Sequence, residues 1–364
     1  MLKLIPLLLI ITACHSTMKK SSKQIELIDL SAVSKDTFVN GGFSGLVFEK
    51  QIGDELIFLS HSDRGPNGEE IETHNKNVSK RPFLKADFQP FWIRFSVNRK
   101  TKAAKLIELI HLTLPDGKPL NGLPNVDGHE IPVTIAGKEL TIDINGIDPE
   151  SLCFDGNHFW MGEEYGPSIL KFTASGKLLK RYVPEGTYAD GDKSLFNAIL
   201  PQDMLRRKNN RGFEGIACKD GKIFAILQSP LKDEKKVVRI FEFDPKSETV
   251  TKEYFYPLES KKADKIGDLT FMNDSLLVLE QNGETGDDGI HKIFKVNLDK
   301  VDSDGHLKKT LVVDLVEAGY SFSEKVEGLA MINDTEIAVV NDNDFAVNDS
   351  SLKTIMGFFK IGDE

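Results

Sequence analysis

The chain has 364 residues, and its formal net charge is −10 at pH 7. Its 40% hydrophobic and 28% charged residues are ordinary proportions for a soluble globular protein, and its length fits either two domains or one large all-β domain. The negative charge argues against nucleic acid as a partner, because nucleic acid phosphates need a basic surface.

The first 13 residues have the pattern of an export signal. Lys3 gives a positive start, and the apolar run at 4–11 is too short to span a bilayer. Ile11-Thr12-Ala13-Cys14 resembles a bacterial lipoprotein cleavage box, so Cys14 is the predicted lipidation site; an ordinary secretory signal with an incidental cysteine is the alternative. We expect a polar tether at 14–23, a domain at 24–364, and a lipid-anchored protein on the periplasmic or outer-membrane face of a bacterial cell envelope.

A repeated unit follows a short apolar strand at 24–31. Each copy begins with a polar residue and an apolar run, turns at Gly, Asn or Asp, and returns in a strand that ends in acidic or polar residues. The copies start at 44, 150, 214, 268 and 327. The last three starts are 54 and 59 residues apart, a repeat length typical of propellers and arrays.

The copies predict an all-β propeller with five four-stranded blades. The last copy lacks a fourth strand, and the strand at 24–31 has no local partner, so the N-terminal strand is expected to close the ring. The segment 114–147 is either an insertion or a sixth, degenerate blade. A second insertion, 185–210, contains a candidate short helix at 195–207 that is interrupted at Pro201.

Strand direction predicts where the polar ends of the copies meet. The start of each first strand and the end of each second strand share one face of the ring, while the tight turns fall on the other face. The carboxylates of the copies should therefore converge at the mouth of the central channel. Such a cluster needs protons, basic partners or a hard cation with oxygen ligands. The alternative is that inner-strand acids accept hydrogen bonds from neighbouring blades and only join the ring together.

Basic and aromatic residues accompany the acids. Arg64, Arg211 and Lys325 could bind a phosphate, carboxylate or sulfate, or could form ion pairs that balance the acids. His61 could be a base or a structural residue, and Tyr165 could cap a pocket or simply pack. Glu163 and Glu164 face opposite sides of their strand, so at most one of the pair serves each purpose.

Cys153 and Cys218 lie in the first strands of two copies. The pattern favours small buried hydrophobic residues. A disulfide is the alternative outside the cytoplasm, although two cysteines make no framework.

Six motifs in order resemble the bacterial phytase-like (esterase-like activity of phytase) domain family in its lipoprotein form, over residues 43–346. They are Ser44-Gly45-Leu46, Asp63-Arg64-Gly65-Pro66, Glu163-Glu164-Tyr165-Gly166-Pro167, Asn210-Arg211-Gly212-Phe213-Glu214-Gly215, Leu279-Glu280, and Glu327-Gly328-Leu329-Ala330 followed by Asp342-Asn343-Asp344-Phe345. The resemblance implies a β-propeller that acts on phosphate esters. Two departures are Asp-Asn-Asp-Phe at the last motif, where the family tends to Asp-Asp-Asn-Phe, and Gln228 where a Glu often stands.

The sequence and the resemblance together predict a metal-dependent phosphomono- or phosphodiesterase. The expected metal ligands, with Ca²⁺ the favoured ion, are Asp63, Glu150, Glu164, Asp268, Glu280 and Asp342. The expected catalytic residues are Glu163, Glu214 and Glu327. The expected substrate-binding residues are Arg64, Arg211, Lys325 and Tyr165. We expect a monomer that binds a small phosphate ester or another anionic ligand.

Two other functions fit the same sequence. One is a non-catalytic propeller that binds a ligand or protein and holds a structural cation. The other is a metal-dependent lactone or sugar-ester hydrolase, because a fold alone does not decide the chemistry.

Overall fold

The computed structural model describes residues 25–33, 41–75, 78–126, 130–187, 195–260 and 262–361. The predicted signal, the tether and Cys14 lie outside these residues. Within the described ranges, no helix combines the length and the hydropathy that a bilayer crossing requires.

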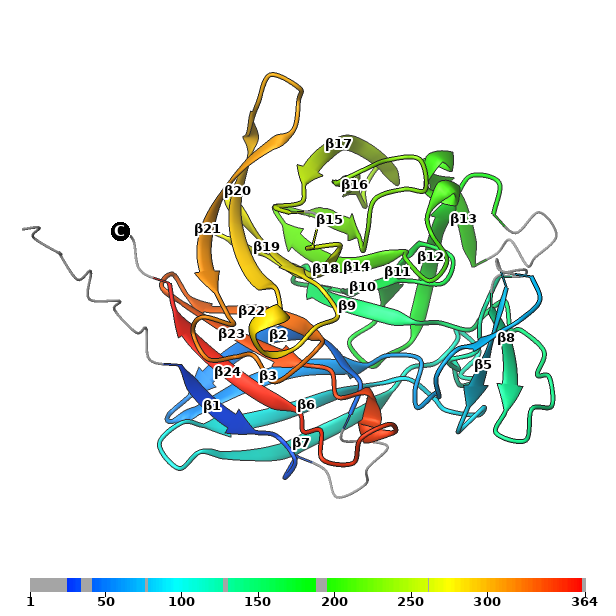
Figure 1. Cartoon of the computed structure of the whole chain (residues 1–364), viewed down its shortest axis with the longest axis horizontal. Helices are drawn as coiled ribbons and strands as arrows, with labels where there is room; N and C mark the ends of the chain where they lie inside the picture. The colour runs from blue at the N-terminus through cyan, green and yellow to red at the C-terminus, as the bar shows by residue number, and fades with distance from the viewer. Residues whose placement is uncertain are drawn as a thin grey trace, which may run out of the picture.

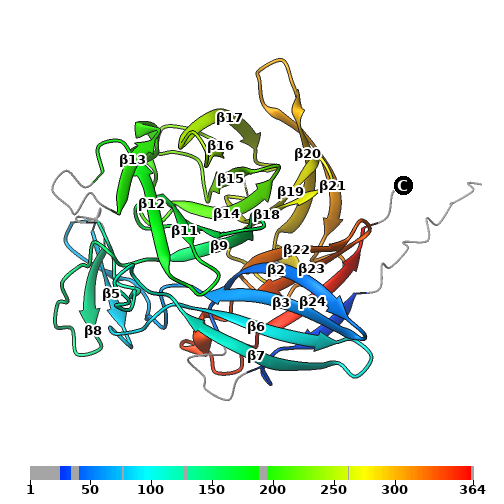
Figure 2. The same cartoon turned by 180° about the vertical axis from the view of Figure 1, so that it is seen from behind.

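Five β-sheets surround a central axis (Figures 1 and 2). The first contains β2 (Phe43–Ile52), β3 (Glu55–Ser62), β6 (Phe91–Asn98) and β7 (Ala103–His111). The second contains β9 (Pro149–Phe154), β10 (Phe159–Glu163), β11 (Ser168–Phe172), β12 (Leu178–Pro184) and β13 (Phe196–Leu200). The third contains β14 (Phe213–Lys219), β15 (Lys222–Leu227), β16 (Val237–Asp244) and β17 (Thr249–Pro257). The fourth contains β18 (Lys265–Met272), β19 (Ser275–Gln281), β20 (His291–Val301) and β21 (Leu307–Asp314).

The fifth sheet confirms the predicted closure of the ring. Its order is β1 (Glu26–Asp29), β24 (Ile355–Lys360), β23 (Glu336–Asn341) and β22 (Val326–Asn333). Strand β1 pairs antiparallel with β24, so that Glu26 lies opposite Phe358. The two ends of the described chain are thus held in one blade, and neither contributing segment is left as an unpaired edge.

The strand that begins each repeat is the innermost strand of its blade. Strands β2, β9, β14, β18 and β22 contact one another in that order, and β22 contacts β2 again. The approach is close: a Cβ atom on Gly215 would lie 2.9 Å from the amide nitrogen of Leu269, and one on Gly328 would lie 3.1 Å from the carbonyl carbon of Gly45. The glycine after the first acid of a repeat is therefore required where neighbouring inner strands meet.

The described parts of the two insertions form no sixth blade. From 114–147 comes β8 (Glu130–Thr134), which joins β4 (Ile71–Glu72) and β5 (Ser79–Phe83) in a three-stranded sheet beside the ring (Figure 1). In the second insertion, β13 pairs in parallel with β12 where a helix was predicted. Only the short 3₁₀ helix η1 (Gln202–Arg206) follows Pro201. Pairing to an open sheet edge outweighed the local helical pattern there.

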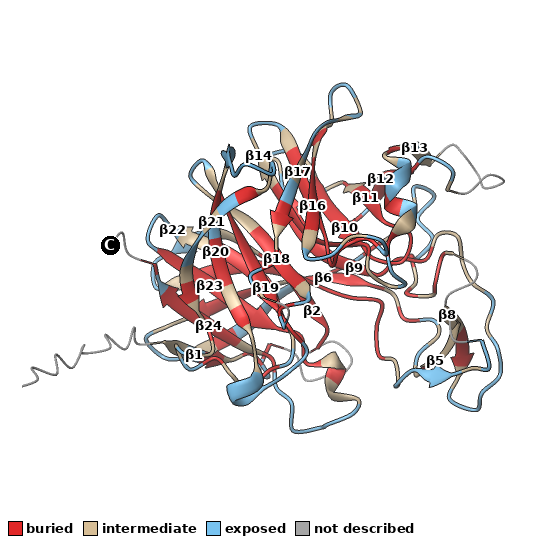
Figure 3. Ribbon diagram, turned by 45° about the horizontal axis from the view of Figure 1, so that its top comes forward, coloured by how far each residue is buried: buried red, intermediate tan, exposed pale blue. Residues whose placement is uncertain are grey.

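The core lies between neighbouring blades. Apolar side chains alternate along the strands, and burial is concentrated in the strands that line these interfaces (Figure 3). One cluster joins the second, third and fourth blades and includes Trp160, Tyr182 and Phe243. Two more 3₁₀ turns, η2 (Gly286–Asp288) and η3 (Asp344–Ala346), follow second strands on the side where polar residues gather.

Cys153 and Cys218 form a disulfide between inner strands β9 and β14. The sequence pattern favoured unpaired buried cysteines, and that interpretation is wrong. The cause is the ring: β9 and β14 are neighbours, and the two Cα atoms are 5.7 Å apart, within the usual range for a bridge.

We predict that replacing both cysteines by serine lowers the free energy of unfolding by about 2–4 kcal/mol, since the bridge closes a large loop in the unfolded chain. The two cysteines are 65 residues apart. Urea unfolding of the wild type with and without reductant, compared with the double variant, measures this. A wild type that is equally stable in reductant would contradict the prediction.

Candidate functional site

A polar cavity of about 280 Å³ opens where the inner strands begin and the second strands end. Its acidic lining residues are Asp63, Glu69, Glu150, Glu164, Glu324, Glu327, Asp342 and Asp344. Its basic lining residues are Arg64, Arg81, Arg211, Lys265 and Lys325. The predicted convergence of acids and bases on one face is thus observed.

Two structurally equivalent positions of the repeat supply six of the cavity-lining residues: Asp63, Glu150, Glu164, Gln228, Glu327 and Asp342. The first is the start of the inner strand, occupied by Ser44, Glu150, Glu214, Gly267 and Glu327. The second is the residue at or just after the end of the second strand, occupied by Asp63, Glu164, Gln228, Gln281 and Asp342. The blade that contains Gly267 and Gln281 supplies no carboxylate at either position. It contributes Lys265 to the cavity instead.

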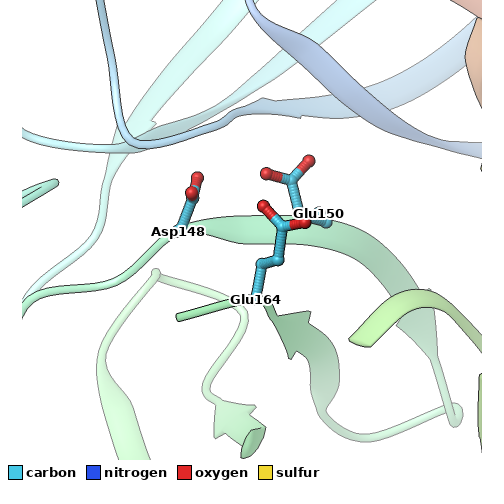
Figure 4. Close-up of side chains that lie close together, drawn as sticks. All are labelled: Asp148, Glu150 and Glu164. Atoms are coloured by element: carbon cyan, nitrogen blue, oxygen red, sulfur yellow. The ribbon is translucent and has the colours of Figure 1, made fainter. Parts of the chain in front are cut away.

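Three carboxyl groups meet on the second blade (Figure 4). Asp148 and Glu150 flank the start of β9, Glu164 follows β10, and one oxygen from each lies within 4.8 Å of the others. All three are buried. Asp148 Oδ2 and Glu164 Oε1 accept no hydrogen bond from any residue that the structure describes. Arg64 Nε is 3.5 Å from the first oxygen, and Arg211 Nη1 is 3.7 Å from the second.

Burial and mutual repulsion shift the protonation of this trio. Burial, followed by the charges of Asp148 and Glu164, raises the pKa of Glu150 well above its usual range. Burial and the charge of Asp148 raise the pKa of Glu164 to about 8, although Arg211 opposes the shift. Burial also raises the pKa of Asp148, against the effect of Arg64 and of a hydrogen bond from Glu150. Without a cation, the trio therefore holds protons that free carboxyl groups would lose near neutral pH.

The remaining acids of the cavity experience the same repulsion. Burial and the neighbouring charges of Asp342 and Asp148 raise the pKa of Asp63. Burial and the charge of Asp344 raise that of Asp342, while Lys325 opposes the shift. The acidic cluster thus extends across the cavity from the second blade to the first and fifth.

The basic residues are held by the acids around them. Arg64 is 7% exposed and donates to Glu130 Oε1 and to the hydroxyl of Tyr165, 3.1 and 3.3 Å away. Lys325 binds Asp344 and lies 3.4 Å from Asp342. The side chain of Arg211 is 39% exposed, which leaves it free to meet a ligand. The ion pairs that the sequence offered as one interpretation are therefore present, and these groups also line the cavity.

Residues 39–345 match the family described as "Phytase-like: Esterase-like activity of phytase". The chain belongs to this family. An uncharacterized secreted protein of Arthroderma benhamiae is 28% identical over 184 residues, which are 38% of this chain and 35% of that protein. The match thus spans about a third of that relative.

Two solved structures resemble the phytase-like chain at low identity. Myxococcus xanthus glutaminyl cyclase has 9% identity and a TM-score of 0.43, with 93% of this chain and 96% of that chain covered. The PQQ-bound aldose sugar dehydrogenase of Streptomyces coelicolor has 8% identity and a TM-score of 0.38, with 93% and 98% covered.

The structure of the phytase-like domain places four predicted acids outside the cavity lining: Glu163, Glu214, Asp268 and Glu280. Glu214 is buried and accepts a hydrogen bond from the Gln228 amide at 2.6 Å. Glu163 is fully buried beside the buried Arg181 and accepts hydrogen bonds from Ser168 and Asn125. Glu280 accepts from the Tyr256 hydroxyl at 2.6 Å and pairs with a lysine on β21. Glu163 stands one residue before the cavity-lining Glu164, and Glu280 stands one residue before the equivalent Gln281. Strand alternation turns both acids to the opposite side.

Asp268 has a structural role: it accepts a hydrogen bond from the neighbouring blade, as the alternative interpretation of the inner-strand acids predicted. Its carboxylate accepts from the amide of Leu269 at 2.7 Å and from the amide of Leu329, on the neighbouring blade, at 2.8 Å. Gly267, not Asp268, is equivalent to Glu214, so the predicted start of this copy was one residue late. Asp268 therefore joins β18 to β22.

Tyr165 packs below the cavity. It is 4% exposed, and its hydroxyl donates to the carbonyl of Gly122 at 2.8 Å while accepting from Arg64. Tyr165 does not line the cavity, and its hydroxyl instead holds the guanidinium of Arg64 in position. The buried His61, whose pKa burial lowers to about 4, also lies outside the lining.

Sequence reasoning missed several residues of the site. Asp148 precedes Glu150 by two positions, so alternation alone places them on one side. Asp344 begins η3 just after β23, where its amide donates to Asp342 Oδ1 at 2.8 Å, and it corresponds to the departure noted in the last motif. Arg81 and Glu130 come from the separate sheet of β4, β5 and β8, and no repeat pattern could place that sheet against the cavity.

We predict that, with chelator present, the protein loses stability as the pH rises from about 4.5 to about 8. The folded protein keeps a proton on Glu164 up to a pKa of about 8, whereas the unfolded chain loses it near 4.5. Folding therefore costs progressively more as the pH rises through this window. Thermal melts across the window should show a falling melting temperature, which a divalent cation restores most strongly at the upper end.

The matched control is Glu164→Gln, which carries no titrating carboxyl at that position. Its melting temperature in chelator should depend less on pH than that of the wild type. A wild type whose melting temperature is flat or rises across the window would contradict the assigned repulsion.

Proposed function

We propose that this phytase-like domain is a metal-dependent phosphoric ester hydrolase. The observation that carries the proposal is the buried trio of Asp148, Glu150 and Glu164, with two carboxyl oxygens that accept no hydrogen bond, beside arginines that share their cavity. Buried like charges are costly unless a cation or protons compensate them. A site of this kind suits the joint binding of a cation and an anion.

The donor set fits a hard divalent cation. All three groups are carboxylates, and oxygen ligands are those that Ca²⁺ and Mg²⁺ prefer. No sulfur or imidazole lies among the cavity-lining residues that would select a softer metal. We propose Ca²⁺ as the resident ion. Bound there, the cation would lower the pKa of a water molecule and offset the charge of a phosphate.

The basic side chains supply the anion site. Arg64 is fixed by Tyr165, Glu130 and Asp148, so its guanidinium is oriented before a ligand arrives. The more exposed Arg211 and Lys325 lie on the walls of the same cavity. Guanidinium groups bind phosphate oxygens through paired hydrogen bonds. A volume of about 280 Å³ admits the phosphate and a small part of its ester, and leaves a larger alcohol group outside.

Two acids in different surroundings can divide the proton transfers. Glu327 lies near Lys325 and Lys265, which oppose the rise that burial causes in its pKa, and accepts a hydrogen bond from Ser44. It is the proposed base for the attacking water. Glu214 lies near Glu164 and Glu327, and burial with their charges raises its pKa well above its usual range. Glu214 is the proposed acid that donates a proton to the leaving oxygen.

The expected result for Glu150→Gln or Glu164→Gln is a loss of at least about 100-fold in cleavage of a generic phosphomonoester or phosphodiester, with weaker cation binding. Glu185→Gln is the matched control, since Glu185 is exposed and outside the cavity. Activity is followed with Ca²⁺, Mg²⁺ or Mn²⁺ after chelation, and circular dichroism checks the fold of each variant.

The same assays, with the melting temperature followed alongside cleavage, distinguish the proposed hydrolase from the two other functions. Cation-dependent stabilisation without turnover of any ester would favour a binding propeller with a structural cation. Turnover of a lactone or a sugar ester, with none of a phosphoester, would favour the other hydrolase. Full phosphoesterase activity in both trio variants would contradict the proposed site.

We propose that the protein works outside the cytoplasm and is attached to a membrane by a lipid on Cys14. The cleavage-box pattern at 11–14 and the disulfide between Cys153 and Cys218 support this, because such bridges persist in oxidising compartments. Cys14→Ala should move the protein from the membrane fraction of producing cells to the soluble fraction. Equal membrane association of the variant and the wild type would contradict the anchor.

A further inference from the structure

A second and larger cavity opens further along the same inner strands. It has a volume of about 840 Å³ and is lined by the middle and end of each inner strand, whereas the starts of these strands line the acidic cavity. We call it the apolar funnel. It lies toward the ends of the inner strands, where the repeats make their tight turns.

The repeat gives the funnel its apolar wall. The position two residues after the start of each copy is Leu46, Leu152, Ile216, Leu269 and Leu329, and all five side chains are buried and line the funnel. Two residues further along stand Phe48, Phe154, Cys218, Phe271 and Met331, which also line it. Since alternate residues of a strand share a side, each inner strand presents one apolar column from the base of the funnel toward its rim.

The rim exposes large apolar side chains to water. Ile52 is 59% exposed, Ile107 is 51% exposed and Phe154 is 44% exposed, and all three line the same cavity. Single exposed hydrophobic residues are ordinary on a protein surface, but a group of them around an apolar cavity marks a binding site. The volume lies within the usual range for small-molecule pockets, which are mostly apolar with a few polar groups.

The charges at the rim indicate the kind of ligand. The funnel is lined by Glu49, Lys50 and Arg94. Arg94 is neutralised, because it pairs with Glu49 at 2.9 Å and also with Glu108. Lys50 is exposed and has no ion pair within the described ranges of the chain. Among the described residues that line the funnel, Lys50 is thus the basic side chain that remains free to pair with an anion.

We infer that the apolar funnel binds a long-chain carboxylate of the fatty-acid type. Its alkyl chain packs against the leucine and phenylalanine columns, and its carboxylate meets Lys50 at the rim. The funnel and the acidic cavity share the inner strands but no lining residue, so this inference stands apart from the proposed hydrolase activity.

The test is isothermal titration of the full mature chain with dodecanoate below its micelle concentration, and separately with dodecan-1-ol as an uncharged probe. We expect saturable binding of one dodecanoate per chain. Met331→Trp should weaken the binding of both probes at least 10-fold, since the half-buried Met331 belongs to an apolar column of the funnel and an indole there would occupy it.

Lys50→Glu tests the head group and is an exposed change that leaves the core intact. The change should weaken the binding of dodecanoate about 5-fold or more, since exposed charge pairs are worth up to about 1 kcal/mol. The affinity for dodecan-1-ol should stay unchanged. Lys138→Glu, at an exposed position outside the funnel, is the matched control and should change neither probe.

Three results would overturn the inference. They are the absence of saturable dodecanoate binding, equal binding by the Lys50→Glu and Lys138→Glu proteins, and undiminished binding by a folded Met331→Trp protein. Phosphoesterase activity does not enter this test, so the proposed hydrolase function can fail while the funnel assignment stands.

Discussion

The repulsion among buried carboxyl groups at one mouth of the channel is the constraint on which the polar half of the structure depends. Asp148, Glu150 and Glu164 are brought together by blade geometry, and nearby arginines compensate them only in part. A protein retains such an arrangement at a cost in stability. The proposed function explains that cost, because a cavity that binds a cation and an anion needs charges that remain incompletely satisfied until a ligand arrives.

Ring closure makes this geometry possible. The pairing of β1 with β24 holds the fifth blade complete, and the fifth blade sets β22 between β18 and β2. The glycines of the inner strands let these strands approach, and Asp268 joins two of them through backbone amides. The same strands then serve two environments: their starts carry carboxylates, and their later residues carry leucine and phenylalanine.

The sequence predicted the blades well because each copy combines strand alternation with turn residues, and because an unpaired first strand matched an incomplete last blade. It also placed Glu150, Glu164, Glu327, Asp63 and Asp342 on one face. It misplaced Asp268 because a shift of one residue reverses the side on which a strand residue points. It could not place Arg81 or Glu130, and it wrongly favoured unpaired cysteines at Cys153 and Cys218, because these contacts depend on how separate segments pack in three dimensions.

The most direct test of the account is a crystal structure of the protein grown with Mn²⁺, with anomalous scattering used to locate the ion. The account predicts an anomalous peak bounded by the carboxylates of Asp148, Glu150 and Glu164, with oxygen ligands only. That peak should be absent from crystals of Glu164→Gln grown in the same way. An empty trio in the wild type, or a peak that persists unchanged in the variant, would contradict the central claim that these carboxylates form the cation site.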